Sequence, residues 1–84
     1  MTREQVLAWL ETRRPVPPPA LRERLRSAVH DAPGDIVSHL AGLGDELLDR
    51  VASRPSGGRE LALDLLAADA FATYAFEAQA EEYA

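Results

Sequence analysis

The chain has 84 residues, which is the size of one domain, with no cysteine, nine arginines, no lysine and a formal net charge of −5. The absence of cysteine excludes disulfides and thiolate zinc sites, and the acidic balance argues against nucleic acid as a partner, because duplex affinity depends on neutralising phosphates. Arginine without lysine, together with abundant alanine, leucine and proline, is typical of a GC-rich bacterial genome.

Two helices joined by a stiff connector are predicted for the first 30 residues. Thr2, with a glutamine three residues later, forms the capping box of a helix over about residues 3–14, in which Trp9 faces the core. The proline-rich segment 15–19 cannot continue that helix and predicts an extended connector. A second helix is expected over about residues 20–30.

Two longer helices are predicted for the rest of the chain. Asp35 is a suitable N-cap for a helix over about residues 36–53, and its apolar stripe keeps phase across Gly42 and Gly44, which predicts one unbroken helix. The last helix, residues 59–82, is apolar on nearly all sides through its first two-thirds, as in buried helices. Three short companions cannot enclose a helix roughly 36 Å long, so a second chain is expected to cover it.

These elements predict an all-α fold: a single small four-helix domain over residues 1–84, with the last helix longest, central and at an oligomer interface. Homodimerisation would also supplement the marginal stability of so short a chain. The side chains expected at this interface lie along one side of the last helix: Leu61, Leu65, Ala68, Asp69, Ala72 and Phe76.

Asp69 is the carboxylate in the least polar stretch of the chain, "LLAADAFATYAF". An unpaired buried carboxylate is very unfavourable, so we expect Asp69 to be paired with an arginine or to be protonated. Residues 1–30 have a net charge of +3 and residues 31–84 a net charge of −8, so the two halves should attract each other within one chain or between two. The candidate partners on the second helix are Arg22, Arg24 and Arg26. A partner-binding anchor and a catalytic acid are the alternative roles for Asp69.

Other polar groups are weak candidates for chemistry. Asp35 and His39 have the spacing of metal ligands, but Asp35 is needed as a cap, and a solvated helix face is expected. Glu77 and Glu81 lack the Glu-x-x-His partners of a di-iron site and are expected in a fraying acidic helix end. "SHLAGLG" resembles the helix around the phosphorylated histidine of histidine phosphotransfer domains, although the spacing differs by one residue and the lysine is missing.

The leading functional hypothesis is a non-catalytic protein–protein interaction module, such as an accessory subunit, adaptor or regulator, that acts through the last helix. It is expected to bind itself and also another protein, without metal, cofactor, nucleic acid or membrane. The alternative is a small helical enzyme or phosphocarrier that uses His39 or Asp69, and a distant third is an acidic inhibitor that mimics nucleic acid. The N-terminus lacks the apolar core of a signal peptide, which predicts a soluble cytoplasmic protein.

Overall fold

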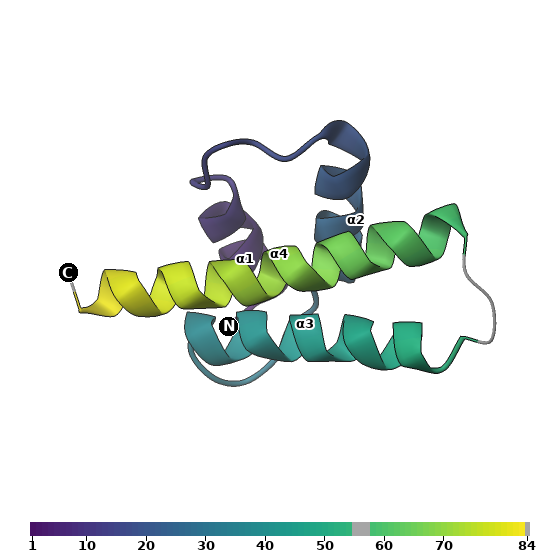
Figure 1. Cartoon of the computed structure of the whole chain (residues 1–84). Coiled ribbons are helices and arrows are strands. Elements are labelled where there is room, and N and C mark those ends of the chain that lie inside the picture. The colour runs from purple at the N-terminus through teal and green to yellow at the C-terminus, as the bar shows by residue number, and fades with distance from the viewer. Residues whose placement is uncertain (55–57, 84) are drawn as a thin grey trace.

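The computed structural model describes residues 1–54 and 58–83, and these residues form four helices and no strand. The helices are α1 (Arg3–Leu10), α2 (Pro19–Ala28), α3 (Ile36–Ala52) and α4 (Arg59–Glu82) (Figure 1). The predicted all-α class is confirmed, and α4 is the longest helix and packs most extensively against α3.

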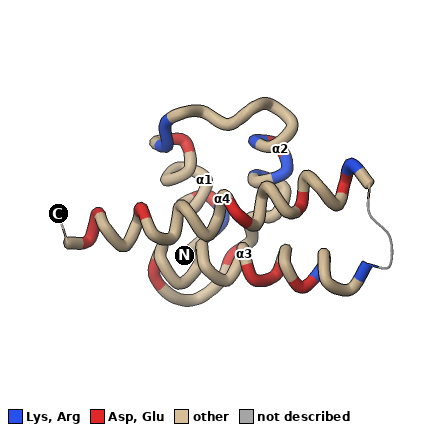
Figure 2. Tube along the Cα trace, in the orientation of Figure 1, with Lys and Arg blue, Asp and Glu red and all other residues tan. Residues whose placement is uncertain are grey.

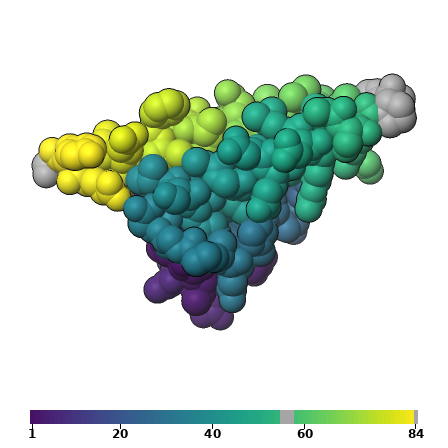
Figure 3. All heavy atoms as spheres, turned by 90° about the horizontal axis from the view of Figure 1, so that it is seen from below, coloured from purple at the N-terminus to yellow at the C-terminus, as the bar shows by residue number. Residues whose placement is uncertain are grey.

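The core of the fold is an antiparallel hairpin of α3 and α4. The shorter helices α1 and α2 lie on one side of this hairpin (Figure 1), where α2 packs against α4, and in the view from below in Figure 3 they lie behind α3. The largest fully buried side chains come from three helices and meet between these layers: Val6, Leu40, Leu43, Leu47 and Phe71. One face of the hairpin is therefore covered by α1 and α2, and the opposite face is left open.

The first two helices are shorter than their apolar periods predict. The helix expected over residues 3–14 ends at Leu10, because Thr12 turns back and its hydroxyl donates a hydrogen bond to the carbonyl of Trp9 at 2.6 Å. The approaching proline also disfavours helical backbone in the residue before it. Similarly, α2 ends at Ala28 rather than at residue 30, since Val29 is extended and buries its side chain in the core.

The longer helices follow their predicted bounds closely. Asp35 accepts a hydrogen bond from the backbone N–H of Ser38 at 2.9 Å, which makes it the N-cap of α3, and α3 ends one residue before the predicted position. The helix continues without a break through both glycines, as the phase of its apolar stripe indicates. The bounds of α4 are those expected from the sequence.

The two glycines of α3 have different surroundings. A Cβ atom built on Gly44 would lie 3.3 Å from the carbonyl oxygen of Ala68 and 3.5 Å from the Cβ of Phe71. No atom lies within 4 Å of the corresponding position on Gly42. Gly44 therefore lies at a close contact between the two long helices, whereas Gly42 has no packing role.

Gly42→Ala should stabilise the protein by up to about 1 kcal/mol, because alanine is the better helix former and nothing obstructs its methyl group. Gly44→Ala should be destabilising by about 1 kcal/mol or more, since the α4 backbone would have to move away. Urea denaturation followed by circular dichroism measures both values. Equal stabilisation by the two substitutions would contradict the close contact at Gly44.

Within the described residues, no helix has the length and apolarity needed to cross a bilayer.

Candidate functional site

The open face of the α3–α4 hairpin contains an apolar groove. Its α3 wall is formed by Val37, Ala41, Gly44 and Leu48, and its α4 wall by Ala68, Ala72, Ala75 and Phe76. Its polar lining residues are Asp45 and Gln79. Most of the floor is glycine or alanine, so the side chains that allow the helices to approach are also too small to fill the space between them.

Large apolar side chains on both helices that form this groove remain in contact with solvent. Phe76 is 74% exposed, Leu48 is 49% exposed and Leu65 is 45% exposed. Leu48 comes from α3 and the other two from α4, so the exposed apolar surface spans both helices. An apolar groove lined by exposed side chains from two helices is typical of an interaction site.

The groove volume of about 250 Å³ limits what it can hold. Sites that enclose a small-molecule ligand generally have volumes of roughly 300–1,000 Å³ and surround most of the ligand. This groove is smaller and open along its length, so its shape suits a row of side chains from another protein.

The residues predicted at an interface lie on or beside this groove. Ala72 and Phe76 line it and are exposed, Ala68 lines it but is buried against α3, Leu65 is exposed, and Leu61 is half-buried. The sequence analysis did not anticipate the α3 wall. A second apolar stripe with helical spacing, Val37, Ala41 and Leu48, was the available signal beside the main stripe of that helix.

The expected buried ion pair exists in α4, but Asp64 forms it instead of Asp69. Asp64 is 2% exposed, and its Oδ1 accepts a hydrogen bond from Arg24 Nε at 2.5 Å. Arg54 Nη2 lies 3.2 Å from the other carboxylate oxygen of Asp64. This cluster links α2, α4 and the segment after α3, so it holds α2 against the hairpin.

Asp69 is exposed, and no hydrogen bond or ion pair to it occurs among the described parts of the chain. The proposed pairing with an arginine of α2 is therefore wrong for Asp69 within one chain. Arg22 and Arg26 instead contact Glu11, at 2.7 and 3.2 Å. The apolar run around Asp69 was misleading because the outer side of that run faces solvent.

Asp64→Asn should lower the free energy of unfolding by roughly 2–4 kcal/mol, since it removes the charge that compensates two arginines while leaving the shape of the site unchanged. Asp69→Asn is the matched control, and should change stability by less than about 0.5 kcal/mol because the side chain is exposed. Chemical denaturation at neutral pH measures both variants. A larger loss for Asp69→Asn than for Asp64→Asn would contradict this assignment.

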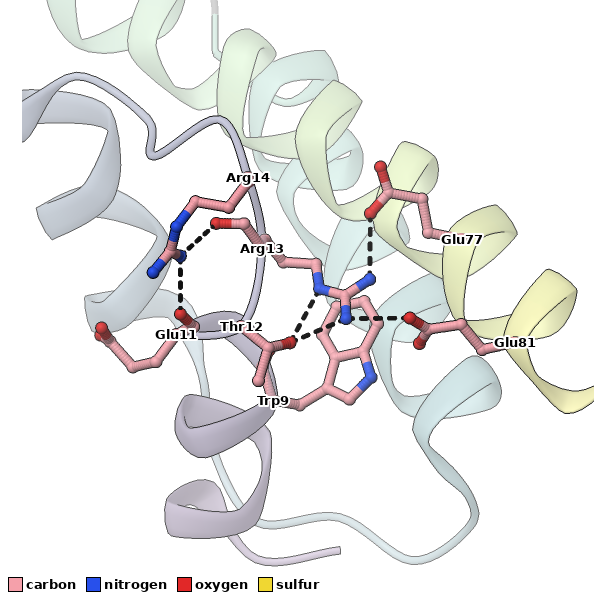
Figure 4. A network of polar contacts seen from close by, with 7 residues as sticks. All are labelled: Trp9, Glu11, Thr12, Arg13, Arg14, Glu77 and Glu81. Atoms are coloured by element: carbon pink, nitrogen blue, oxygen red, sulfur yellow. Dashed lines mark hydrogen bonds and ion pairs between the residues drawn. The ribbon is translucent and has the colours of Figure 1, made fainter. Parts of the chain in front are cut away.

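A second ion cluster connects α1 to the C-terminal part of α4. Arg13 Nη1 lies 3.3 Å from Glu77 and Nη2 lies 3.0 Å from Glu81, and the guanidinium stacks 3.9 Å from the ring centroid of Trp9 (Figure 4). Trp9 in turn meets the edge of Tyr74, with ring centroids 6.0 Å apart. The two glutamates expected in a fraying helix end therefore attach the connector to α4.

The two histidines have structural partners. His39 is 4% exposed, and its Nε2 donates a hydrogen bond to the carbonyl of His30 at 2.8 Å. Its Nδ1 is also buried, so neither ring nitrogen is accessible to a phosphoryl donor. Asp35 and Glu46 are occupied elsewhere, and the described residues contain no group of three side chains placed to hold a metal.

The pKa of His30 is raised above its ordinary value of about 6.5, first by its hydrogen bond to the carbonyl of Asp31 and second by Glu46. The ring nitrogens lie 2.9 Å and 2.8 Å from these two acceptors, and only the protonated ring can donate to both.

His30→Gln should therefore destabilise the protein more at about pH 5.5 than at about pH 8.5. A raised folded-state pKa gives stability that is present below the unfolded pKa and is lost as pH rises through the folded pKa. Glu46→Gln should reduce this pH dependence. Denaturation midpoints of the variant and the wild type at the two pH values provide the measurement. A loss of stability in His30→Gln that grows as pH rises would contradict the assignment.

Comparison with protein-family models, with curated proteins and with solved structures finds no match to this chain.

Proposed function

We propose that this protein is a non-catalytic interaction module that binds a protein partner through the open face of the α3–α4 hairpin. The observation that carries the proposal is the apolar groove lined by the exposed side chains of Leu48 and Phe76, on the face that α1 and α2 do not cover. Burial of exposed apolar surface is the main favourable term in protein association.

The polar clusters support a binding role in preference to a catalytic one. Asp64, Arg13 and Glu46 are each engaged in contacts that hold helices or connectors together. They lie apart from the groove, where the charged lining residue among the described part of the chain is Asp45. One carboxylate on an open apolar surface lacks the neighbouring base or nucleophile that acid–base chemistry requires.

Self-association through α4 is a second form of the same function. The observation that favours it is the exposed Phe76 beside a hollow lined with alanine and glycine on the same face. A two-fold dimer needs a surface that is complementary to itself, and a projecting ring next to a hollow meets that requirement.

Phe76→Arg should abolish partner binding and any self-association, because it places a charge in the wall of the apolar groove. Affinity purification from the cells that produce the protein, together with light scattering after size exclusion, measures both effects. The expected result is a stoichiometric partner, or a dimer, that is retained by the wild-type protein and lost in the variant.

The matched control is Leu66→Arg, which introduces the same charge at a side chain of α4 that is exposed but does not line the groove. Leu66→Arg should bind as the wild type does, and circular dichroism should show that both variants fold. The proposal fails if no interaction is found, or if both variants lose it equally.

A further inference from the structure

We propose that the groove binds a cationic amphipathic helix of another protein, with apolar side chains entering the hollow and arginine or lysine side chains reaching the acidic residues beside it. This inference rests on the proposed function, and it specifies the chemistry of the partner.

The shape of the groove suits a short helix. Phe76 and Val37 line one part of it and Leu48 lines another, so the α3 wall extends over 12 residues, or about 16 Å. A partner helix of about three turns covers that length, with anchor side chains at positions i, i+4, i+7 and i+11. The groove floor accepts these anchors because alanine and glycine leave room beside the two helix backbones.

Exposed acidic residues lie on both helices that form the groove. Asp45 lines it on the α3 side, and Asp49 follows one turn later and is also exposed. On α4, Asp69 is exposed and lies one turn from Leu65 and seven residues before Phe76, which places it on the same side of the helix. A helix in the groove would therefore have carboxylates along both of its flanks.

The basic residues of the chain are concentrated elsewhere. Arg13, Arg24 and Arg54 are engaged with acids of α4, and Arg22 and Arg26 contact Glu11. Figure 2 shows basic residues in α2 and in the connector before it, on the α1–α2 side of the hairpin, and others where α3 ends and α4 begins. Much of the attraction between the two halves of the chain is thus satisfied within one molecule. No arginine lines the groove, whose charged lining residue among the described part of the chain is Asp45.

This charge distribution favours a cationic helix over a second copy of the chain. In a two-fold dimer built on the groove, the acids of one copy would face the acids of the other, and like charges across an interface oppose association. A cationic helix instead pairs with the same acids, and electrostatic attraction also speeds its encounter with the groove.

The test uses two designed peptides of about 16 residues with identical leucine positions at the spacing given above. One carries arginine at the flanking positions and the other carries glutamate. Fluorescence anisotropy measures the binding of each labelled peptide to the full chain. The arginine peptide should bind at least about tenfold more tightly, and raising the salt concentration from about 0.05 M to about 0.5 M should weaken its binding severalfold.

Substitutions in the protein connect this binding to the groove. Asp45→Asn combined with Asp69→Asn should weaken binding of the arginine peptide by about fivefold or more and reduce the salt dependence of that binding. Glu4→Gln combined with Glu23→Gln removes the same charge from exposed residues of α1 and α2, and should leave binding unchanged. Phe76→Ala should weaken the binding of both peptides, because it removes apolar surface from the groove.

Each outcome decides the inference. Equal binding of the two peptides, or equal effects of the two double variants, would show that the partner need not be cationic. The proposed interaction function would not be affected by that result. A protein that binds neither peptide but forms a Phe76-dependent dimer, strengthened by salt, assigns the groove to a second copy. The proposed function fails separately, when no Phe76-dependent association of any kind is found.

Discussion

The close contact between α3 and α4 at Gly44 is the constraint on which the rest of the structure depends. A Cβ atom at Gly44 would lie 3.3 Å from the carbonyl oxygen of Ala68, so a side chain there would push the two long helices apart by a few tenths of an ångström. Ala72 and Ala75 also have small side chains, and together with Gly44 they leave the groove on the open face unfilled. Tight packing of the helix backbones and a binding surface therefore have one physical cause.

The ion pairs place the shorter helices and thereby determine which face of the hairpin stays open. Asp64 holds Arg24 of α2, and the Glu77–Glu81 pair holds Arg13 after α1, both on the covered side. These contacts use arginines of the N-terminal half to neutralise acids of the C-terminal half. The acids beside the groove are left without such partners among the described residues, which gives the open face its negative charge.

The candidate site could be predicted in part from the α4 sequence. The stripe that includes Leu65, Ala72 and Phe76 was assigned to an interface, and these residues lie on the open face because an all-round apolar helix has more surface than its neighbours cover. The buried acid was assigned to Asp69 instead of Asp64, since α4 is apolar on most sides and periodicity does not show which side meets α2. The α3 wall was missed for a related reason, because its second stripe is weaker than the stripe that fills the core.

The sequence by itself determined the helical class, the caps of α1 and α3, the unbroken course of α3 and the bounds of α4, because these follow from local hydrogen bonding and a period of 3.6 residues. Only the tertiary structure decided which carboxylate is buried and which side of α4 remains exposed. Those features depend on where α1 and α2 cross the hairpin. Their position is set by contacts between residues far apart in the chain, such as Arg24 with Asp64, which no local pattern encodes.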